Sequence, residues 1–382
     1  MKKNVFKKAF AVAMSVMMVG AFMTGCGSKS GSDENVLVIG GSGPLTGDYS
    51  TYGISVKQGA DLAVKEINEA GGVNGTEFKL VFEDDMADPT SAASAYATMA
   101  DNGMQVSLGA TTSGACLTAV AEAEKDGILV VTPSASQVEC AAPENVFRIC
   151  FTDTLQGAYA AQVIKEKNIG TKVAVIYDKS NDYSAGIQKA FVDKAAEINL
   201  EVVTNQAFTN QSNTDFSVQL QAVKNSGADL VFLPIYAQEA AYILTQAQKL
   251  GINIQFMGGD GLDGVIEKAG EANVSALEDV LLLTPFFAKD DSDFVKAYRD
   301  EYGTTPDQFA ADSYDAVYAI KAAMEKSGAV PTDSDFNEKM IAAMTEIEVE
   351  GVTGTMTWDK SGEPDKTAYI VQIKDGKYVE FN

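Results

Sequence analysis

The sequence contains no histidine among its 382 residues. This absence excludes catalytic triads and dyads that use an imidazole base, histidine metal sites and imidazole acid–base catalysis. Arginine is scarce as well, because Arg148 and Arg299 are the only two, so a guanidinium clamp on an anionic ligand is not expected. An anion would have to be held by backbone N–H groups and hydroxyls, and any catalysis would depend on carboxylates.

Nucleotide-binding motifs are missing too. Gly41 and Gly43 follow an apolar strand in "IGGSGPLTG", but no third glycine stands at the required spacing and Pro44 interrupts the turn, so the dinucleotide fingerprint is not met. No GxxxxGK(S/T) motif occurs either. The acids at 83–85 could in principle act as catalysts, but acids at the end of an exposed strand more often form a solvated rim.

The chain is acidic, with a formal net charge of −24. Such a surface repels nucleic acid and anionic lipid, so we expect no nucleic-acid partner. Hydrophobic residues make up 46% and charged residues 21% of the chain, which is typical of a globular protein. A chain of this length can form two domains.

The N-terminus has the layout of an export signal. Four lysines among the first eight residues precede an apolar run at 9–23, which is too short for a comfortable membrane span. The following "MTGC" resembles the lipobox of bacterial lipoproteins, which implies cleavage before Cys26 and lipidation of its sulfur; the alternative is an ordinary signal peptide with a chance cysteine. We expect a signal peptide at 1–25, a flexible tether at 26–35, and a body anchored to the outer face of the cytoplasmic membrane.

Three further cysteines, Cys116, Cys140 and Cys150, follow the lipobox. In an exported protein two of them can pair. Cys116 lies just inside a predicted helix, and Cys140 follows a second polar turn expected beside it, so a Cys116–Cys140 disulfide is favoured. The alternative is three small buried hydrophobic residues.

From residue 36 onward, short apolar strands alternate with helical patterns of 10 to 15 residues. One series runs to about residue 151 and a second from about 155 to 259. This alternation predicts parallel sheets with right-handed crossovers, and hence an α/β fold with two doubly wound lobes. A mainly helical stretch then runs to residue 344, and short strands close the chain. Because late segments must complete sheets begun earlier, we expect the chain to cross between the lobes more than once, forming a hinge and a cleft.

Polar turns follow several of the predicted strands. The turns at 41–43, 111–114 and 132–136 carry glycines or hydroxyls, and ligands bind outside the carboxyl ends of parallel strands. The turn at 111–114 opens a helix, whose N-terminus favours an anion. A phosphate, a carboxylate and a simple helix cap are the candidates. The missing nucleotide motifs argue against phosphate, and for a single turn a cap alone is the commoner explanation.

The second series ends its strands differently. Tyr183 and Tyr236 stand at two of its strand-to-helix turns, and Asp260 at a third. A buried ammonium without a partner would cost several kcal/mol, and Asp260 supplies such a partner. An acid facing hydroxyls across a cleft therefore suits a ligand with one cationic and one anionic end.

Nearly the whole chain after residue 36 resembles the leucine/isoleucine/valine-binding proteins, which are the amino-acid receptors of ATP-driven importers. The matching stretches, in family order, are "GPLTGDYSTYG", "GADLAVKEINEAGGVNG", "LVFEDDMADPTSA", "GATTSGA", "GILVVTPSAS", "FRICFTDTLQG", "YDKSNDYSAG", "QFMGGDG" and "MTWDKSGEP". The resemblance implies a type I periplasmic-binding fold with a three-segment hinge. It also implies two lobes. Residues 36–153 and 286–366 form the first lobe, and residues 154–285 and 367–382 form the second.

The same resemblance implies roles for individual residues. Ser113 matches the serine that donates hydroxyl and amide hydrogens to the ligand α-carboxylate. The Ser134 carbonyl and the Ser136 hydroxyl match groups that meet the α-ammonium, with Ser136 also close to the carboxylate. Asp260 stands where leucine-binding relatives carry a glutamate as ammonium partner, and it is shorter by one methylene. Tyr183 and Tyr236 match tyrosines on the second lobe. Tyr52 and Phe309 match the aromatic walls that receive the side chain of the ligand.

We therefore expect a monomeric, lipid-anchored receptor that passes a free amino acid, of branched-chain aliphatic type, to the permease subunits of an ABC transporter by hinge closure. No cofactor, metal or enzymatic activity is expected. Other small amino acids, amides and carboxylates are the alternative ligands. A ligand-sensing domain and a carboxylate-dependent hydrolase are the alternative functions, although no confident pair of catalytic acids is evident.

Overall fold

The structure is a computed structural model that describes residues 35–366 and 368–381. The predicted signal peptide at 1–25, the lipidation site Cys26 and nearly all of the tether at 26–35 lie outside these residues. Within them, no helix is both long enough and apolar enough to span a bilayer.

The first lobe is built on a five-stranded sheet in which all neighbouring strands are parallel. The strand order is β2-β1-β3-β4-β5. The strands are β1 (Val36–Gly43), β2 (Glu77–Asp84), β3 (Val106–Ala110), β4 (Val130–Thr132) and β5 (Val146–Arg148).

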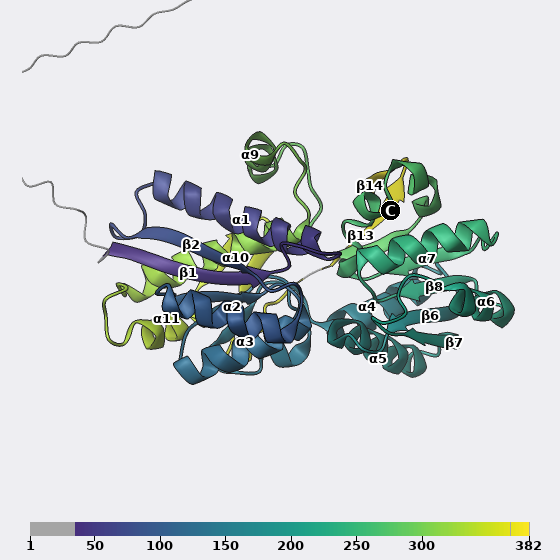
Figure 1. Cartoon of the computed structure of the whole chain (residues 1–382), viewed down its shortest axis with the longest axis horizontal. Helices are drawn as coiled ribbons and strands as arrows, with labels where there is room; N and C mark the ends of the chain where they lie inside the picture. Colours follow the sequence, from purple (N-terminus) through teal and green to yellow (C-terminus); the bar gives the residue numbers. More distant parts are fainter. Residues whose placement is uncertain (1–34, 367, 382) are drawn as a thin grey trace, which may run out of the picture. The chain divides into compact units, whose positions relative to one another are not determined.

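Helices cover both faces of this sheet (Figure 1). They are α1 (Ser50–Glu69), α2 (Pro89–Asp101), α3 (Ser113–Asp126), α10 (Gln308–Ser327) and α11 (Phe336–Met344). Helix α9 (Asp293–Tyr302) packs on α1 and α10 rather than on the sheet. Helices α2 and α3 pack on one face, while α1, α10 and α11 pack on the other. Gly59 of α1 lies directly against the Ala310 backbone of α10, where a side chain would collide with it.

The second lobe is built on a seven-stranded sheet in the order β14-β13-β10-β9-β8-β6-β7. Its helices α4 and α5 pack on one face, and α6, α7 and α8 pack on the other. The strands are β6 (Lys172–Asp178), β7 (Glu201–Phe208), β8 (Leu230–Leu233), β9 (Gln255–Gly258), β10 (Leu281–Thr284), β13 (Tyr369–Lys374) and β14 (Lys377–Glu380). The helices are α4 (Asp153–Glu166), α5 (Asp182–Glu197), α6 (Ser217–Ser226), α7 (Ala237–Lys249) and α8 (Val265–Ala269), with 3-10 turns η3 (Asp260–Leu262) and η4 (Glu271–Leu277).

The predicted α/β fold with two parallel-sheet lobes is confirmed, with one difference at the end of the chain. Strands β13 and β14 form an antiparallel hairpin, and β13 is antiparallel to β10. Asp375 and Gly376 form its two-residue turn, and both have positive φ, at 49° and 71°. An Asp-Gly pair is a typical turn of this kind, so the sequence carried a hairpin signal that periodicity alone does not reveal.

Three segments join elements of the two lobes within the described ranges. They lie between β5 and α4, between β10 and α9, and between β12 (Gly354–Thr357) and β13. Strand β12 pairs only with β11 (Glu348–Gly351), in a separate two-stranded sheet. The chain therefore crosses between the sheets as expected, and the exact lobe limits at 153, 285 and 366 stay a prediction.

Candidate functional site

A small cavity lies where residues from both lobes meet. Its free volume is about 20 Å³, which is room for about one water molecule. Seven of the eight residues predicted to contact a ligand line it, and Ser136 does not. The lining residues are Tyr52, Thr111, Thr112, Ser113, Ser134, Tyr183, Tyr236, Asp260, Gly261 and Phe309.

One end of the cavity is the N-terminus of α3. Strand β3 ends at Ala110, and Ser113 is the first residue of the helix. Thr112 occupies the N-cap position, but its side chain makes no capping hydrogen bond. The first-turn N–H groups are thus not capped by that hydroxyl, and they carry the partial positive charge of a helix N-terminus. The simple-cap explanation does not hold at this turn, and an anion suits it.

The neighbouring turn, which follows β4, carries both predicted serines. Ser134 lines the cavity, and its hydroxyl donates to the Thr111 carbonyl at 2.7 Å. Ser136 is fully buried, and its carbonyl accepts a hydrogen bond from the Asp153 backbone N–H at 2.8 Å. The structure therefore places Ser136 between the cavity turns and the N-terminus of α4 rather than on the cavity wall itself.

Arg148 holds this turn in place from behind. Its side chain is fully buried, and its guanidinium donates to the carbonyls of Ala135, Gln137 (2.9 Å) and Val138 (3.3 Å). It also pairs with Glu363, with Nε 2.9 Å from Oε2. This role could not be predicted from the sequence, because an arginine inside an apolar strand has no characteristic spacing to the loop that it binds.

The other end of the cavity is acidic. Asp260 is 3% exposed, and its Oδ1 accepts a hydrogen bond from the Tyr183 hydroxyl at 2.7 Å. Its backbone N–H donates to Gln156 Oε1 at 3.1 Å. Burial raises the pKa of Asp260 to about 6, although the hydrogen bonds from Tyr183 and Gln156 act to lower it. A cation at this end would favour the ionised form of the acid.

Aromatic side chains form the walls between the two ends. The ring centroids of Tyr52 and Phe309, from α1 and α10, lie 4.8 Å apart in a T-shaped arrangement. Tyr183 and Tyr236 of the second lobe stack with centroids 4.9 Å apart and ring planes 5° apart. The Tyr52 hydroxyl donates to the Gly261 carbonyl at 2.7 Å and accepts from the Ala237 N–H at 2.8 Å. These rings offer an apolar enclosure for a side chain.

Further contacts tie the lobes together around the cavity. The Tyr49 hydroxyl, just before α1, donates to Glu239 Oε1 of α7 at 2.7 Å. Gln308 Nε2, at the start of α10, donates to the Asp260 carbonyl at 2.7 Å. An amino acid does not fit into a free volume of about 20 Å³, so ligand entry requires that some of these interlobe contacts separate.

The predicted Cys116–Cys140 disulfide is not present in the structure, where Cys116, Cys140 and Cys150 are all free and buried. The two thiols are neighbours, as expected, but each has a further polar partner. Cys116 Sγ lies 3.7 Å from Thr132 Oγ1, and Cys140 Sγ lies 3.6 Å from the Ser113 carbonyl. A hydrogen bond between the thiols lowers the pKa of Cys116 to about 7, against the effect of burial.

The acids at the end of β2 are not simply a solvated rim. Asp84 accepts hydrogen bonds from the Leu45 N–H at 2.9 Å and the Thr46 hydroxyl at 2.6 Å. Asp85 is fully buried and accepts one from the Ser42 hydroxyl at 2.8 Å. Both carboxylates therefore hold the turn that leads from β1 into α1, which is a structural task.

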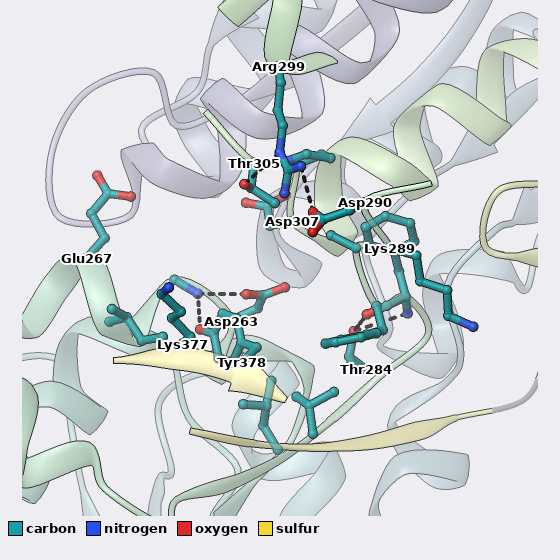
Figure 2. Close-up of a pocket in the computed structure, with 18 of the residues that line it drawn as sticks. Asp263, Glu267, Thr284, Lys289, Asp290, Arg299, Thr305, Asp307, Lys377 and Tyr378 are labelled. Carbon is teal, nitrogen blue, oxygen red and sulfur yellow. Dashed lines mark hydrogen bonds and ion pairs between the residues drawn. The ribbon is translucent and has the colours of Figure 1, made fainter. Parts of the chain in front are cut away.

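A much larger cavity, of about 960 Å³, lies elsewhere between the β10–α9 segment, the start of α10 and the β13–β14 hairpin. Figure 2 shows Arg299 joined to Asp290 and Thr305 at one side of it, and Asp263 near Tyr378 at another. Its lining includes no residue that was predicted to bind the ligand.

Two acids of the large cavity, the buried Asp263 and the half-buried Asp307, already have internal partners. Asp263 accepts hydrogen bonds from the N–H groups of Gly264 at 3.0 Å and Gln308 at 3.2 Å. Asp307 accepts from the Ser55 hydroxyl at 2.6 Å and the Ala310 N–H at 2.9 Å. Asp263 therefore holds the start of α10 against the second lobe, whereas Asp307 holds it against α1 of the first lobe. The described residues contain no group of three or more acidic or cysteine side chains placed to bind a metal ion.

Comparisons with known proteins agree with this architecture. The family model described as "Periplasmic binding protein" matches residues 36–377. The Leu/Ile/Val-binding protein homolog 3 of Brucella melitensis is 31% identical over 356 residues, which covers 90% of this chain and 93% of that protein. The leucine-, isoleucine-, valine-, threonine- and alanine-binding protein of Pseudomonas aeruginosa is 28% identical over 328 residues, covering 84% and 85%.

Solved structures give the same result. One is the crystal structure of LivJ of Streptococcus pneumoniae, a branched-chain amino acid transporter substrate-binding protein, in complex with isoleucine. Its sequence is 30% identical and its TM-score is 0.82, and the match covers 90% of this chain and 97% of that one. A leucine-binding protein LivK of Thermotoga maritima is 28% identical with the same TM-score, over 91% and 98%. This chain belongs to the periplasmic binding protein family.

Proposed function

We propose that this protein is the extracytoplasmic receptor of an ABC importer and that it binds a free amino acid between its two lobes. The observation that carries the proposal is the polarity of the small cavity. The uncapped N-terminus of α3 with Ser113 lies at one end, and Asp260 lies at the other. A zwitterion with its carboxylate at Ser113 and its ammonium at Asp260 satisfies both ends without an arginine.

We infer that the ligand is a branched-chain aliphatic amino acid. The walls of the cavity are aromatic rings and threonines, which favour an apolar side chain of modest size. Several relatives are described as binding leucine, isoleucine or valine, and one was solved with isoleucine. No covalent chemistry is part of this function, because binding and release suffice for a transport receptor.

Delivery depends on hinge motion in this proposal. The ligand enters when the lobes separate and is held when they close, because only the closed form contacts its two ends at once. The proposed lobes are 36–153 plus 286–366 and 154–285 plus 367–382, and the proposed partners are the permease subunits of the transporter. Lipidation of Cys26 would anchor the monomeric receptor to the outer face of the cytoplasmic membrane through the tether at 26–35.

A thermal-shift panel of the twenty amino acids, with their amides and deaminated acids, tests the proposal. Ligand at about 100 times its Kd adds about 2.7 kcal/mol to the free energy of unfolding, so leucine, isoleucine and valine should raise the Tm clearly. A rise with another amino acid alone would correct the ligand. A rise with a deaminated acid alone, which lacks the ammonium, would contradict the role of Asp260.

A further inference from the structure

The threonine and serine hydroxyls that line the small cavity differ in whether the protein supplies their hydrogen-bond partner. The Ser134 hydroxyl donates to the Thr111 carbonyl at 2.7 Å, and the Thr111 hydroxyl donates to the Ser42 carbonyl at 3.0 Å. Thr112 Oγ1 is buried and has no partner. Of the residues that line the cavity, all of which the structure describes, Thr112 is the only one with a buried side-chain oxygen or nitrogen in this condition.

The main chain around Thr112 is fixed although its hydroxyl is free. Thr112 is the N-cap residue of α3 and is 6% exposed. Its carbonyl accepts a hydrogen bond from the Cys116 N–H at 2.8 Å, as the start of the helix requires. An N-cap hydroxyl usually accepts from an N–H of the first turn, but the Thr112 hydroxyl makes no such bond. Because the surrounding protein offers it no partner, a partner has to come from the contents of the cavity.

The free hydroxyl affects which amino acid side chains the cavity favours. A buried hydroxyl without a partner costs free energy, and an apolar side chain that fills the cavity leaves this cost in place. A ligand hydroxyl removes it, because each of the two hydroxyls can donate or accept. Thr112 is the chain neighbour of Ser113, the proposed partner of the ligand carboxylate, and substituents on the β-carbon of an amino acid lie close to its carboxylate.

We propose that Thr112 is a specificity-determining residue that hydrogen-bonds a hydroxyl on the β-carbon of the ligand, so that the receptor takes threonine as well as the branched-chain aliphatic amino acids. This inference rests on the proposed function. Threonine and valine have nearly the same shape, so a purely apolar pocket separates them poorly. A site that hydrogen-bonds the ligand hydroxyl separates them better, because the apolar analogue leaves the buried group of the site unpaired.

Calorimetry with threonine and valine as titrants tests the proposal. The wild-type protein should bind threonine at least as tightly as valine. Thr112→Val keeps the shape of the side chain and removes the hydroxyl, so the ratio of the threonine Kd to the valine Kd should rise about tenfold or more. Thr112→Ser keeps the hydroxyl and should keep the wild-type ratio. Thr118→Val, within α3 but outside the cavity lining, is the matched control and should leave both Kd values unchanged.

The ratio separates recognition of the ligand side chain from other roles of Thr112. An equal loss for both ligands in Thr112→Val would assign the hydroxyl to the carboxylate, which both ligands share, or to the fold, and would overturn the proposal. An unchanged ratio, or a wild-type protein that binds valine but not threonine, would also overturn it and leave the proposed function intact. Thr112→Ala replaces Thr112→Val if the latter does not fold. If the wild-type protein binds no amino acid, the proposed function fails, and this inference fails with it.

Discussion

The Tyr183 hydroxyl donates a hydrogen bond of 2.7 Å to Asp260 Oδ1 and accepts one of 2.8 Å from the Gly261 N–H. Tyr183 therefore fixes the orientation of the only acid that lines the small cavity. It occupies one carboxylate oxygen, which leaves the other for a ligand ammonium. Because Asp260 is shorter than a glutamate, its carboxylate reaches less far, but its side chain also has fewer rotamers. The hydrogen bond from Tyr183 selects one of these rotamers.

Asp260→Asn should weaken the binding of a zwitterionic ligand strongly. The variant keeps the shape of the side chain but removes the charge opposite the ammonium, and hydrogen bonds to charged groups contribute about 1.5–3 kcal/mol. Calorimetry should show a Kd at least about tenfold higher, with a Tm of the unliganded protein that is unchanged or raised. Asp300→Asn, on the exposed side of α9, is the control. Equal affinity in Asp260→Asn and wild type would remove Asp260 from the site.

Affinity should rise with pH where Asp260 ionises. Burial holds its pKa at about 6 in the unliganded protein, and the ammonium binds the ionised form better. Ligand binding should therefore be weaker at pH 5 than at pH 7.5, with release of protons on binding in the window near pH 6. Calorimetry in two buffers of different ionisation enthalpy measures this release. The absence of proton release at pH 6 would contradict the assignment.

The stability of the unliganded protein should show the opposite trend. Burial, with the charge of nearby Asp263, raises the pKa of Asp307 from 3.8 to about 7. Between these values the unfolded chain has released this proton while the folded chain still holds it, so stability falls as pH rises from about 4 to 7. Asp307→Asn, which can still cap α10, should flatten this part of the stability curve in denaturant titrations.

Asp88→Asn, at the N-cap of α2, is the control for this experiment. It should keep the slope of the wild type. A wild-type stability that increases steadily from pH 4 to 7 would show that the buried acids do not govern this window.

Tyr49→Phe should weaken the closed arrangement without touching the cavity. The variant removes the hydrogen bond to Glu239 between the lobes and leaves the buried carboxylate of Glu239 with one donor, Asn213. A loss of about 1–2 kcal/mol is expected, seen as faster ligand dissociation in stopped-flow measurements. Tyr318→Phe, which removes a similar hydrogen bond to Glu66 within the first lobe, should leave dissociation unaltered. Equal rates in all three proteins would argue against this interlobe contact.

Arg148→Met should lower both stability and affinity. The variant leaves the backbone carbonyls that Arg148 binds without a donor, which costs about 1–3 kcal/mol, and the turn that carries Ser134 and Ser136 loses its support. Glu363 is 28% exposed and can be solvated when its partner is lost. Chemical denaturation and calorimetry measure the two effects. Arg299→Met removes the exposed pair with Asp290 and should cost less than about 1 kcal/mol. A similar small cost for Arg148→Met would contradict the positioning role of Arg148.

Much of the site could be predicted from the sequence because strand ends and helix starts have local signals. Ser113, Tyr183 and Asp260 each stand at such a junction, and parallel sheets bring these junctions to one edge. The buried Arg148 that supports the Ser134 turn was not predicted. Its partners lie in other segments and are selected by tertiary packing, which no spacing along the chain encodes.

The Cys116–Cys140 disulfide stays a prediction, although the structure has both residues as free thiols. The topology does bring Cys116 and Cys140 together, but proximity alone does not decide between a bond and two thiols with separate acceptors. The β13–β14 hairpin was not predicted, although its Asp375-Gly376 turn is a recognised hairpin signal, because the strand–helix alternation of the chain indicates parallel pairing.

A crystal structure of the protein grown with leucine, isoleucine or valine is the most direct test of the central claim. We predict density for the amino acid between the lobes, with its carboxylate at the Ser113 N–H and hydroxyl, and its ammonium within hydrogen-bond distance of Asp260. A ligand bound in the large cavity lined by Asp263 and Asp307, or one with its carboxylate turned toward Asp260, would contradict the account.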